Sequence, residues 1–146
     1  PPLSYTQGTF AEAARVLFHI TGEQSYMDKA AQVLLYGLES NRTTSGGLLR
    51  SEGENMDQSI FKAVFIPYAV NYVLDADADV NSAGRIKEKL LKNADALYKH
   101  VDRTYYPSMF CNYWWGETVQ QGTRVSMGAQ ASGASLMENV ARMVKK

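Results

Sequence analysis

Apolar residues recur at three- and four-residue steps along most of the chain, a spacing that predicts α-helices rather than strands. The pattern predicts helices over residues 9–21, 25–39, 57–74, 82–101 and 129–144. A polar, glycine-rich segment separates the second from the third, and a long irregular segment precedes the last. The sequence therefore predicts an all-α fold with five main helices in antiparallel pairs.

The 57–74 segment is apolar nearly all round, so we expect it to be the most buried of the five. Its β-branched residues would also suit a strand, but its length favours a helix. Pro67 is expected to kink it. A strand in this segment would overturn the predicted fold.

The connections between the helices alternate in length. Short turns follow the two more buried helices, 9–21 and 57–74, whereas long polar segments follow the more amphipathic 25–39 and 82–101. This alternation predicts an inner and an outer set of helices. It also places all the long segments, and the starts of the inner helices, on one rim.

Polar side chains stand near the starts of the three inner helices: Gln7, Asp57, Gln58 and Gln130. Helix N-termini offer free N–H groups and a partial positive charge. We expect these four residues to lie near one rim and to line a polar basin. Capping is the alternative role, above all for Asp57. Glutamine is a poor cap but a good partner for hydroxyl groups.

Charge and composition exclude several classes of function. Fifteen basic and fifteen acidic residues cancel, which argues against a nucleic-acid partner and against a polybasic membrane surface. No window is apolar and long enough to span a bilayer. The single cysteine, Cys111, allows no intrachain disulfide and is expected to be buried. The 146 residues suit one domain or part of one, and a start at Pro1 without methionine predicts a processed or truncated product.

No metal site or cofactor is predicted. Asp75, Asp77 and Asp79 have the spacing of the first ligands of a calcium loop. Val80 stands where that loop needs glycine, however, and Ile86 where it needs glutamate. The segment is therefore expected to be a solvated turn.

Four segments, in order, resemble glycoside hydrolase family 76, the endo-α-1,6-mannanases. They read "SYTQGTFAEAARVLFHITGEQSYMDKA", "GGLLRSEGENMDQSIFKAVFIPY", "NADALYKHV" and "GAQASGASLMENVARM". The resemblance implies an (α/α)6 toroid of inner and outer helices, of which this chain forms about half. It implies a glycosidase acting on α-1,6-linked mannan, a mannan-type oligosaccharide or polysaccharide as partner, and an extracytoplasmic location.

The family's catalytic pair of adjacent aspartates has no counterpart in the sequence. Residues 1–146 therefore resemble a single unit, the C-terminal part of the toroid domain, and we expect this chain alone not to hydrolyse α-1,6-mannan. Half a toroid would leave apolar side chains uncovered around Ile60, Val64 and Phe65. Self-association, or association with the missing N-terminal half, is expected to cover them.

The resemblance and the rim together give eight candidate substrate-binding residues and no catalytic residue. Gly8, within the first motif, is expected to permit close backbone approach. A buried Lys62 would need Asp57 or Glu52 as partner, and either tryptophan would serve equally well in the core. Glu52, Glu54 and Glu117 are loop acids that could approach Asp57. The candidates are Tyr5, Gln7, Arg50, Asp57, Gln58, Lys62, Trp114 and Trp115.

Two other functional readings fit the sequence. One is a different α/α-toroid sugar enzyme, such as an epimerase or an unsaturated glycuronyl hydrolase. The other is a non-catalytic helical interaction module or glycan-binding module, in which the polar rim residues only cap helices. A sugar bound over Trp114 or Trp115 would favour the glycan readings, and a protein bound at the same rim would favour the interaction module.

Overall fold

The computed structural model describes residues 2–104, 109–122 and 124–145. This part of the chain contains five α-helices and a two-residue-per-strand antiparallel hairpin, in which Thr44 pairs with Leu49 and Ser45 with Leu48. The all-α prediction is confirmed. The elements in chain order are α1 (Ser4–Thr21), α2 (Gln24–Glu39), β1 (Thr44–Ser45), β2 (Leu48–Leu49), α3 (Met56–Leu74), α4 (Val80–His100) and α5 (Met127–Val144).

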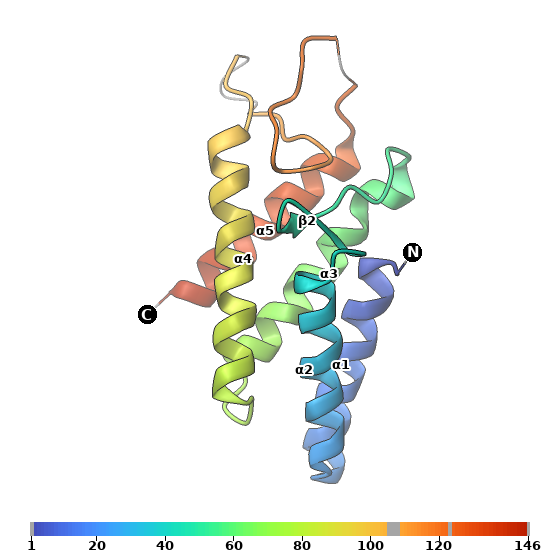
Figure 1. The fold of residues 1–146 in the computed structure, drawn as a ribbon, viewed down its shortest axis with the longest axis vertical. Coiled ribbons are helices and arrows are strands. Elements are labelled where there is room, and N and C mark those ends of the chain that lie inside the picture. The colour runs from blue at the N-terminus through green and yellow to red at the C-terminus, as the bar shows by residue number, and fades with distance from the viewer. Residues whose placement is uncertain (1, 105–108, 123, 146) are drawn as a thin grey trace.

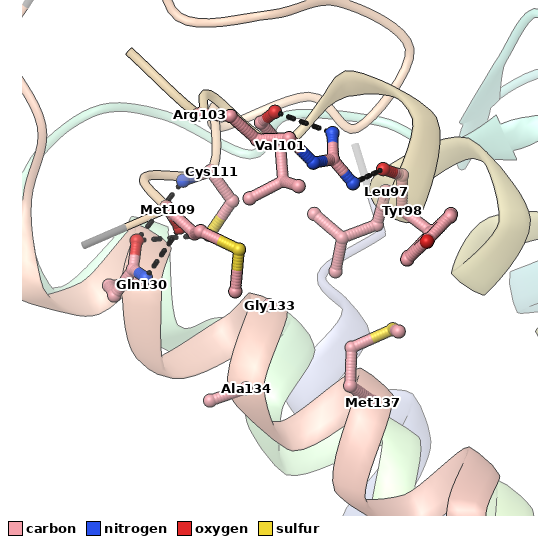
Figure 2. A pocket seen from close by; sticks show the side chains of 10 residues that line it. All are labelled: Leu97, Tyr98, Val101, Arg103, Met109, Cys111, Gln130, Gly133, Ala134 and Met137. Atoms are coloured by element: carbon pink, nitrogen blue, oxygen red, sulfur yellow. Dashed lines mark hydrogen bonds between the residues drawn. The ribbon is translucent and has the colours of Figure 1, made fainter. Parts of the chain in front are cut away.

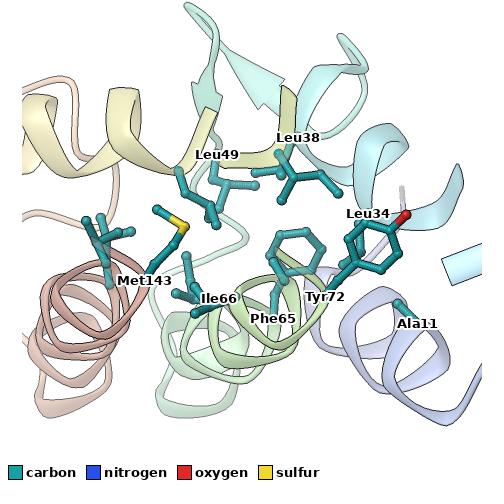
Figure 3. Close-up of a cluster of buried hydrophobic side chains, with 14 of the residues drawn as sticks. Ala11, Leu34, Leu38, Leu49, Phe65, Ile66, Tyr72 and Met143 are labelled. Atoms are coloured by element: carbon teal, nitrogen blue, oxygen red, sulfur yellow. The ribbon is translucent and has the colours of Figure 1, made fainter. Parts of the chain in front are cut away.

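The helices form two layers (Figure 1). Helix α3 lies between α1 and α5 and contacts both, whereas α2 and α4 contact each other and pack across this inner row. Figure 3 shows the inner row nearly end-on, with α4 and α2 running across it. The predicted alternation of inner and outer helices is therefore confirmed, and the arrangement is consistent with part of an α/α toroid.

The core fills the space between the two layers. Side chains from inner and outer helices meet there, each less than a tenth exposed (Figure 3). Helix α3 exposes few side chains along its length, as predicted; these are Met56, Asp57, Ile60 and Leu74. The largest side chains of the core include Trp115, Tyr72, Phe65, Met27, Leu34, Leu38, Ile66, Ile86, Leu90 and Leu136.

Two glycines let the helices approach closely. A Cβ atom on Gly8 of α1 would lie 2.8 Å from the Cα atom of Phe65 on α3, which is too close for any other residue without a shift. A Cβ atom on Gly37 of α2 would lie 2.6 Å from Gln7 Oε1 and 2.9 Å from Phe65 Cε2. The close approach expected at Gly8 is therefore present, and Phe65 is enclosed by α1 and α2.

The uncovered apolar surface lies only partly where it was predicted. Ile60 is 39% exposed, as expected, whereas Phe65 is completely buried, because it points between the layers rather than to the side of the helix row. Other exposed large apolar side chains include Ile20 and Phe10 on α1, Tyr98 on α4 and Met127 on α5. The edges of the half ring therefore add to the exposed apolar surface of the central helix. None of the described helices is both long and apolar enough to cross a membrane.

Helix α1 begins five residues earlier than predicted. Its N-terminus has no cap from its own sequence, but the Glu52 carboxylate accepts a hydrogen bond from Ser4 N (2.7 Å) and another from Ser4 Oγ. The negative charge also suits the positive end of the helix. A cap that comes from 48 residues further along the chain leaves no local signal in the sequence, which is why the prediction was wrong.

The structure does not show capping, the alternative role considered for Asp57. Helix α3 is capped by Asn55, whose side chain accepts from Gln58 N at 2.8 Å, and Asp57 lies in the first turn. Asp79 caps α4 and Ser126 caps α5 in the same way, so both helices begin two residues earlier than predicted. Asp79 thus lies in a turn before α4, where the sequence predicted a solvated turn.

The hairpin in the 40–55 segment was not predicted. Its strands are two residues each, too short for an alternating pattern, and Gly46 and Gly47 at its turn both adopt positive φ. Asn93 of α4 holds it in place, because its buried Oδ1 accepts from Leu49 N at 2.9 Å and its Nδ2 donates to Lys89 O. The hairpin therefore connects the rim to the outer helix layer.

Candidate functional site at the rim

The starts of α1, α3 and α5 lie at the end of the molecule that carries the long segments 40–55 and 101–126 (Figure 1). The short turns after α1 and α3 lie at the opposite end. The helices that carry Gln7, Asp57, Gln58 and Gln130 thus present these residues toward one end, which we call the rim. The opposite end, with residues 22–23 and 75–79, is called the turn end.

An aromatic pair and an acid are accessible on the rim. The rings of Tyr5 on α1 and Phe61 on α3 have centroids 4.5 Å apart and are tilted by 43°. Tyr5 is 36% exposed and Asp57 is exposed. Phe61 follows Asp57 by four residues and so shares its helix face. Phe61 was not among the candidates, although this spacing was a signal that could have found it.

Gln7 is directed inward instead of toward solvent. Its side chain is only 9% exposed, and neither its Oε1 nor its Nε2 has a hydrogen-bond partner among the described residues. It borders a cavity of about 10 Å³, also lined by Glu52 and Lys62. A buried polar group without a partner costs roughly 1–3 kcal/mol. The Gln7 amide therefore has unused hydrogen-bonding capacity at this cavity.

Arg50 and Glu52 close the rim against the start of α1. The Arg50 guanidinium donates to the carbonyl oxygens of Pro2 (3.2 Å) and Ser51 (3.3 Å), while its buried Nε has no partner among the residues described. Glu52 is engaged by Ser4. Because Glu52 is hydrogen-bonded to Ser4, it is not a free carboxylate that could approach Asp57. Arg50 is half-buried.

Lys62 is buried beneath the rim and is 3% exposed. Its ammonium donates to the Tyr113 carbonyl at 2.6 Å and lies 3.9 Å from the centroid of the Trp115 ring. Burial lowers the pKa of Lys62 to about 7, although the Glu52 carboxylate opposes this shift. Lys62 thus anchors the long 101–126 segment to α3. A buried ammonium in this place is not positioned to contact a substrate.

The two tryptophans occupy different environments. Trp115 is 1% exposed and belongs to the hydrophobic core, so its ring face is not offered to a sugar in this structure. Trp114 is half-buried and packs against Gly46 of the hairpin and Gly116. Of the two predicted sugar platforms, only Trp114 lies at the surface.

The remaining two glutamines have contrasting roles. Gln130 is held by the irregular segment: its Oε1 accepts from Cys111 N (3.1 Å), and its Nε2 donates to Met109 O (3.1 Å). Gln58 packs over Gly53, which adopts a φ of 137°, and is half-buried at the rim. Gln130 therefore stabilises the segment, whereas the side chain of Gln58 contacts the loop at Gly53.

A separate hollow of about 230 Å³ lies between the end of α4 and α5 (Figure 2). Its wall is almost wholly apolar, with Leu97, Val101, Met109 and Met137 around the buried Cys111. Burial raises the pKa of the Cys111 thiol, although Lys62 opposes this shift. Arg103 and Gln130 also line the hollow, but both side chains are hydrogen-bonded to the backbone, and the thiol is protonated at neutral pH.

A cluster of possible metal ligands lies at the turn end. Within the described ranges, His19, Asp75 and Asp77 alone bring three such side chains together. The Asp75 carboxylate already accepts from Arg15 (2.7 Å) and contacts His19 Nε2 (2.6 Å). Because the Arg15 guanidinium already neutralises Asp75, we read this cluster as an ion-pair network that joins α1 to the end of α3.

Comparison with known proteins identifies the family. Residues 2–146 match the model of glycosyl hydrolase family 76. The chain belongs to this family. No curated protein matches the chain. The solved structures supply its relatives.

Two of the solved structures that are similar to this family 76 chain differ in their sequence identity to it. The GH76A α-1,6-mannanase from Salegentibacter sp. HEL1_6 has a TM-score of 0.86 and 28% identity, and the match covers 97% of this chain and 40% of the mannanase. The Lin0763 protein from Listeria innocua has a TM-score of 0.83 and 22% identity, covering 97% of this chain and 37% of its own, and shares the fold. The chain thus spans about two fifths of each relative.

The same mannanase has also been solved as inactive variants with bound oligosaccharides. In one, two consecutive aspartates are replaced by alanine and α-1,6-mannotetrose is bound. In the other they are replaced by asparagine and α-1,6-mannotriose is bound. The family 76 chain described here contains no two consecutive aspartates in its 146 residues.

Proposed function

We propose that this chain is the C-terminal part of a family 76 toroid that hydrolyses α-1,6-linked mannan, and that its rim binds the mannan chain. The observation that carries the proposal is the similarity, over 97% of the chain, to a mannanase that has been solved with α-1,6-mannotetrose. The rim supports it independently, because it combines the exposed Tyr5 and the half-buried Phe61 with the exposed carboxylate of Asp57.

The accessible rim residues have complementary roles in this proposal. The Tyr5–Phe61 pair offers an apolar ring face to a mannose unit, and Asp57 accepts hydrogen bonds from its hydroxyls. Gln58 and Trp114 flank this surface. Arg50 lies at its edge, where its carbonyl contacts fix the entry to α1.

The buried candidates act from beneath the surface. Gln7, Lys62 and Trp115 are each less than a tenth exposed and cannot touch a polysaccharide in this conformation. Lys62 and Trp115 fix the position of the segment that carries Trp114. We therefore assign these three residues to shaping the cleft and not to contacting sugar.

The proposal assigns bond cleavage to residues outside the 146. Glycoside hydrolysis requires two carboxyl groups on opposite sides of the scissile bond. Asp57 is one exposed acid on the rim. The Glu52 carboxylate is hydrogen-bonded to Ser4, and Glu117 Oε1 accepts a hydrogen bond from Asn112 Nδ2 at 3.4 Å. The remaining part of the toroid, or a second copy of the chain, would cover the exposed edges at α1 and α5. On the resemblance alone, we propose an extracytoplasmic location.

A binding experiment tests the assignment of the rim. Calorimetric titration of the chain with α-1,6-mannotetraose should show weak binding that Asp57→Asn weakens about tenfold, because one charge-assisted hydrogen bond contributes roughly 1.5–3 kcal/mol. Asp77→Asn is the matched control, since Asp77 is an exposed aspartate at the turn end. Equal affinities of the two variants, or no binding by the unmodified chain, would contradict the assignment.

A hydrolysis assay tests the proposal that this chain binds mannan but that residues outside it cleave the bond. The purified chain is expected to release no reducing sugar from linear α-1,6-mannan, because it lacks consecutive aspartates. Turnover by the chain alone would overturn this part of the proposal. It would then point to Asp57, with a loop glutamate, as the working pair.

A further inference from the structure

A small cavity lies under the rim, where four segments of the chain meet. Ser4 and Gln7 come from α1, Gly37 from α2, Glu52 from the segment after the hairpin, and Lys62 from α3. The cavity has a volume of about 10 Å³, roughly the space that one water molecule needs. It is too small for any sugar, so it is distinct from the surface proposed to bind mannan.

Several polar groups at the cavity lack partners, although Ser4 and Glu52 are hydrogen-bonded to each other. Both amide atoms of Gln7 and the Nε of Arg50 are buried without a partner among the described residues. Lys62 has three N–H donors, of which one is used by the Tyr113 carbonyl. A site with several free donors and acceptors, and with room for one small molecule, meets the requirements of a buried water.

We propose that this cavity holds one permanently bound water molecule, which accepts from Lys62 and completes the hydrogen bonds of the Gln7 amide. A bound anion is disfavoured because the Glu52 carboxylate is part of the wall. A larger occupant is disfavoured because Gly37 already lies against Gln7 Oε1.

Such a water connects the parts of the rim. It bridges α1, through Gln7, to α3, through Lys62, and Lys62 in turn holds the segment that contains Tyr113 and Trp115. Gln7 then acts as a positioning residue for the rim and explains why an amide, and not an apolar side chain, occupies this buried place. This inference does not depend on which ligand the rim binds.

The direct test is a high-resolution crystal structure of the chain. We expect one water within hydrogen-bond distance of both the Gln7 amide and Lys62 Nζ. An empty cavity, or a Gln7 amide bonded to protein atoms, would overturn the proposal. So would a monatomic anion, which a bromide soak would show by its anomalous scattering.

A solution experiment gives an independent readout. The side-chain amide protons of Gln7 should show cross-relaxation with water of the sign that marks a long-lived bound molecule. The exposed Gln32 amide, on α2, is the matched control and should show only the sign of rapidly exchanging surface water. The water should be absent from a crystal structure of Gln7→Met. If that variant does not fold, the two measurements on the unmodified chain decide the question.

Discussion

The rim and the turn end differ in whether their buried polar side chains have hydrogen-bond or ion-pair partners. At the turn end, Arg15 and His19 both pair with Asp75, and Asp79 caps α4. At the rim, both amide atoms of Gln7 and the indole nitrogens of both tryptophans are buried without partners among the described residues. One end satisfies its polar groups internally, and the other does not.

This difference separates polar groups that serve the fold from those that serve a site. Most buried polar groups in native proteins are paired, so unpaired ones mark places where water, an ion or a ligand completes the structure. The rim is also where the chain departs from its regular helical pattern. Local rules are broken most often at functional sites. The contrast therefore supports the rim, and not the turn end, as the functional end.

The largest expected effect tests how the rim segment is anchored. Trp115→Ala should lower the free energy of unfolding by about 3–5 kcal/mol, because it empties a fully buried site and removes the contact with Lys62. Trp114→Ala should lower it clearly less, since Trp114 is half-buried. Urea denaturation of both variants measures the difference. Equal losses would mean that both rings belong to the core.

Lys62 should make the stability depend on pH in an unusual direction. Its pKa falls to about 7 in the folded state from 10.5, so between these values the unfolded chain binds a proton that the folded chain does not. Stability should therefore rise with pH across this window, by at most about 1.4 kcal/mol per unit.

Urea midpoints measured from pH 7 to 10 check this slope. Lys62→Met should remove it, whereas Lys92→Met, on the exposed surface of α4, should leave it unchanged. If Lys62→Met keeps the same dependence of stability on pH, other groups cause it. The proposed effect of the buried Lys62 would then be wrong.

At the turn end, Asp75→Asn should cost about 1–3 kcal/mol at neutral pH, because it breaks the pairs with Arg15 and His19. Burial raises the pKa of Asp75, but hydrogen bonds from His19 and Arg15 outweigh burial and lower it overall. The stabilisation is thus present above the unfolded pKa and is lost as pH falls through the lower folded pKa.

The difference between Asp75→Asn and the unmodified chain should accordingly shrink in acid. Asp77→Asn provides the control, since its side chain is 59% exposed and should cost little at any pH. A cost for Asp75→Asn that does not change between neutral pH and pH values below about 4 would contradict an ion-pair network at this end.

The smallest expected loss of stability distinguishes the helix cap of α3 from the residue proposed to bind sugar. Asn55→Ala should cost about 1 kcal/mol, because it removes the helix cap. Asp57→Ala should cost about 0.5 kcal/mol or less, through its weak interaction with the helix dipole, and should reduce oligosaccharide binding. Thermal unfolding combined with calorimetry distinguishes the two. A larger stability loss for Asp57→Ala than for Asn55→Ala would return Asp57 to a structural role.

Sequence periodicity was sufficient to predict the helices, because each one buries a continuous apolar stripe. The alternation of short and long connections was sufficient to predict that the helices form two layers and that the inner helices begin at the same end. The family motifs include residues near the rim, which we propose as the binding surface. Local patterns record which residues are apolar and near each other along the chain, and these properties are what determine helix type and order.

The orientation of individual side chains could not be predicted in the same way. Glu52 caps a helix 48 residues away, and Lys62 meets a carbonyl 51 residues further on. Trp115 enters the core while its neighbour Trp114 stays at the surface. These outcomes depend on how distant segments pack, which a single sequence without the fold does not specify. The hairpin was missed for a different reason, since its strands are too short to have a period.

The central claim is that the rim binds α-1,6-mannan, and chemical-shift mapping by NMR tests it most directly. Titration with α-1,6-mannotetraose should shift the backbone amide signals around Tyr5, Asp57 and Trp114 and leave those around His19 and Asp77 unchanged. Shifts concentrated at the turn end or around the Cys111 hollow, or none at saturating ligand, would contradict the claim.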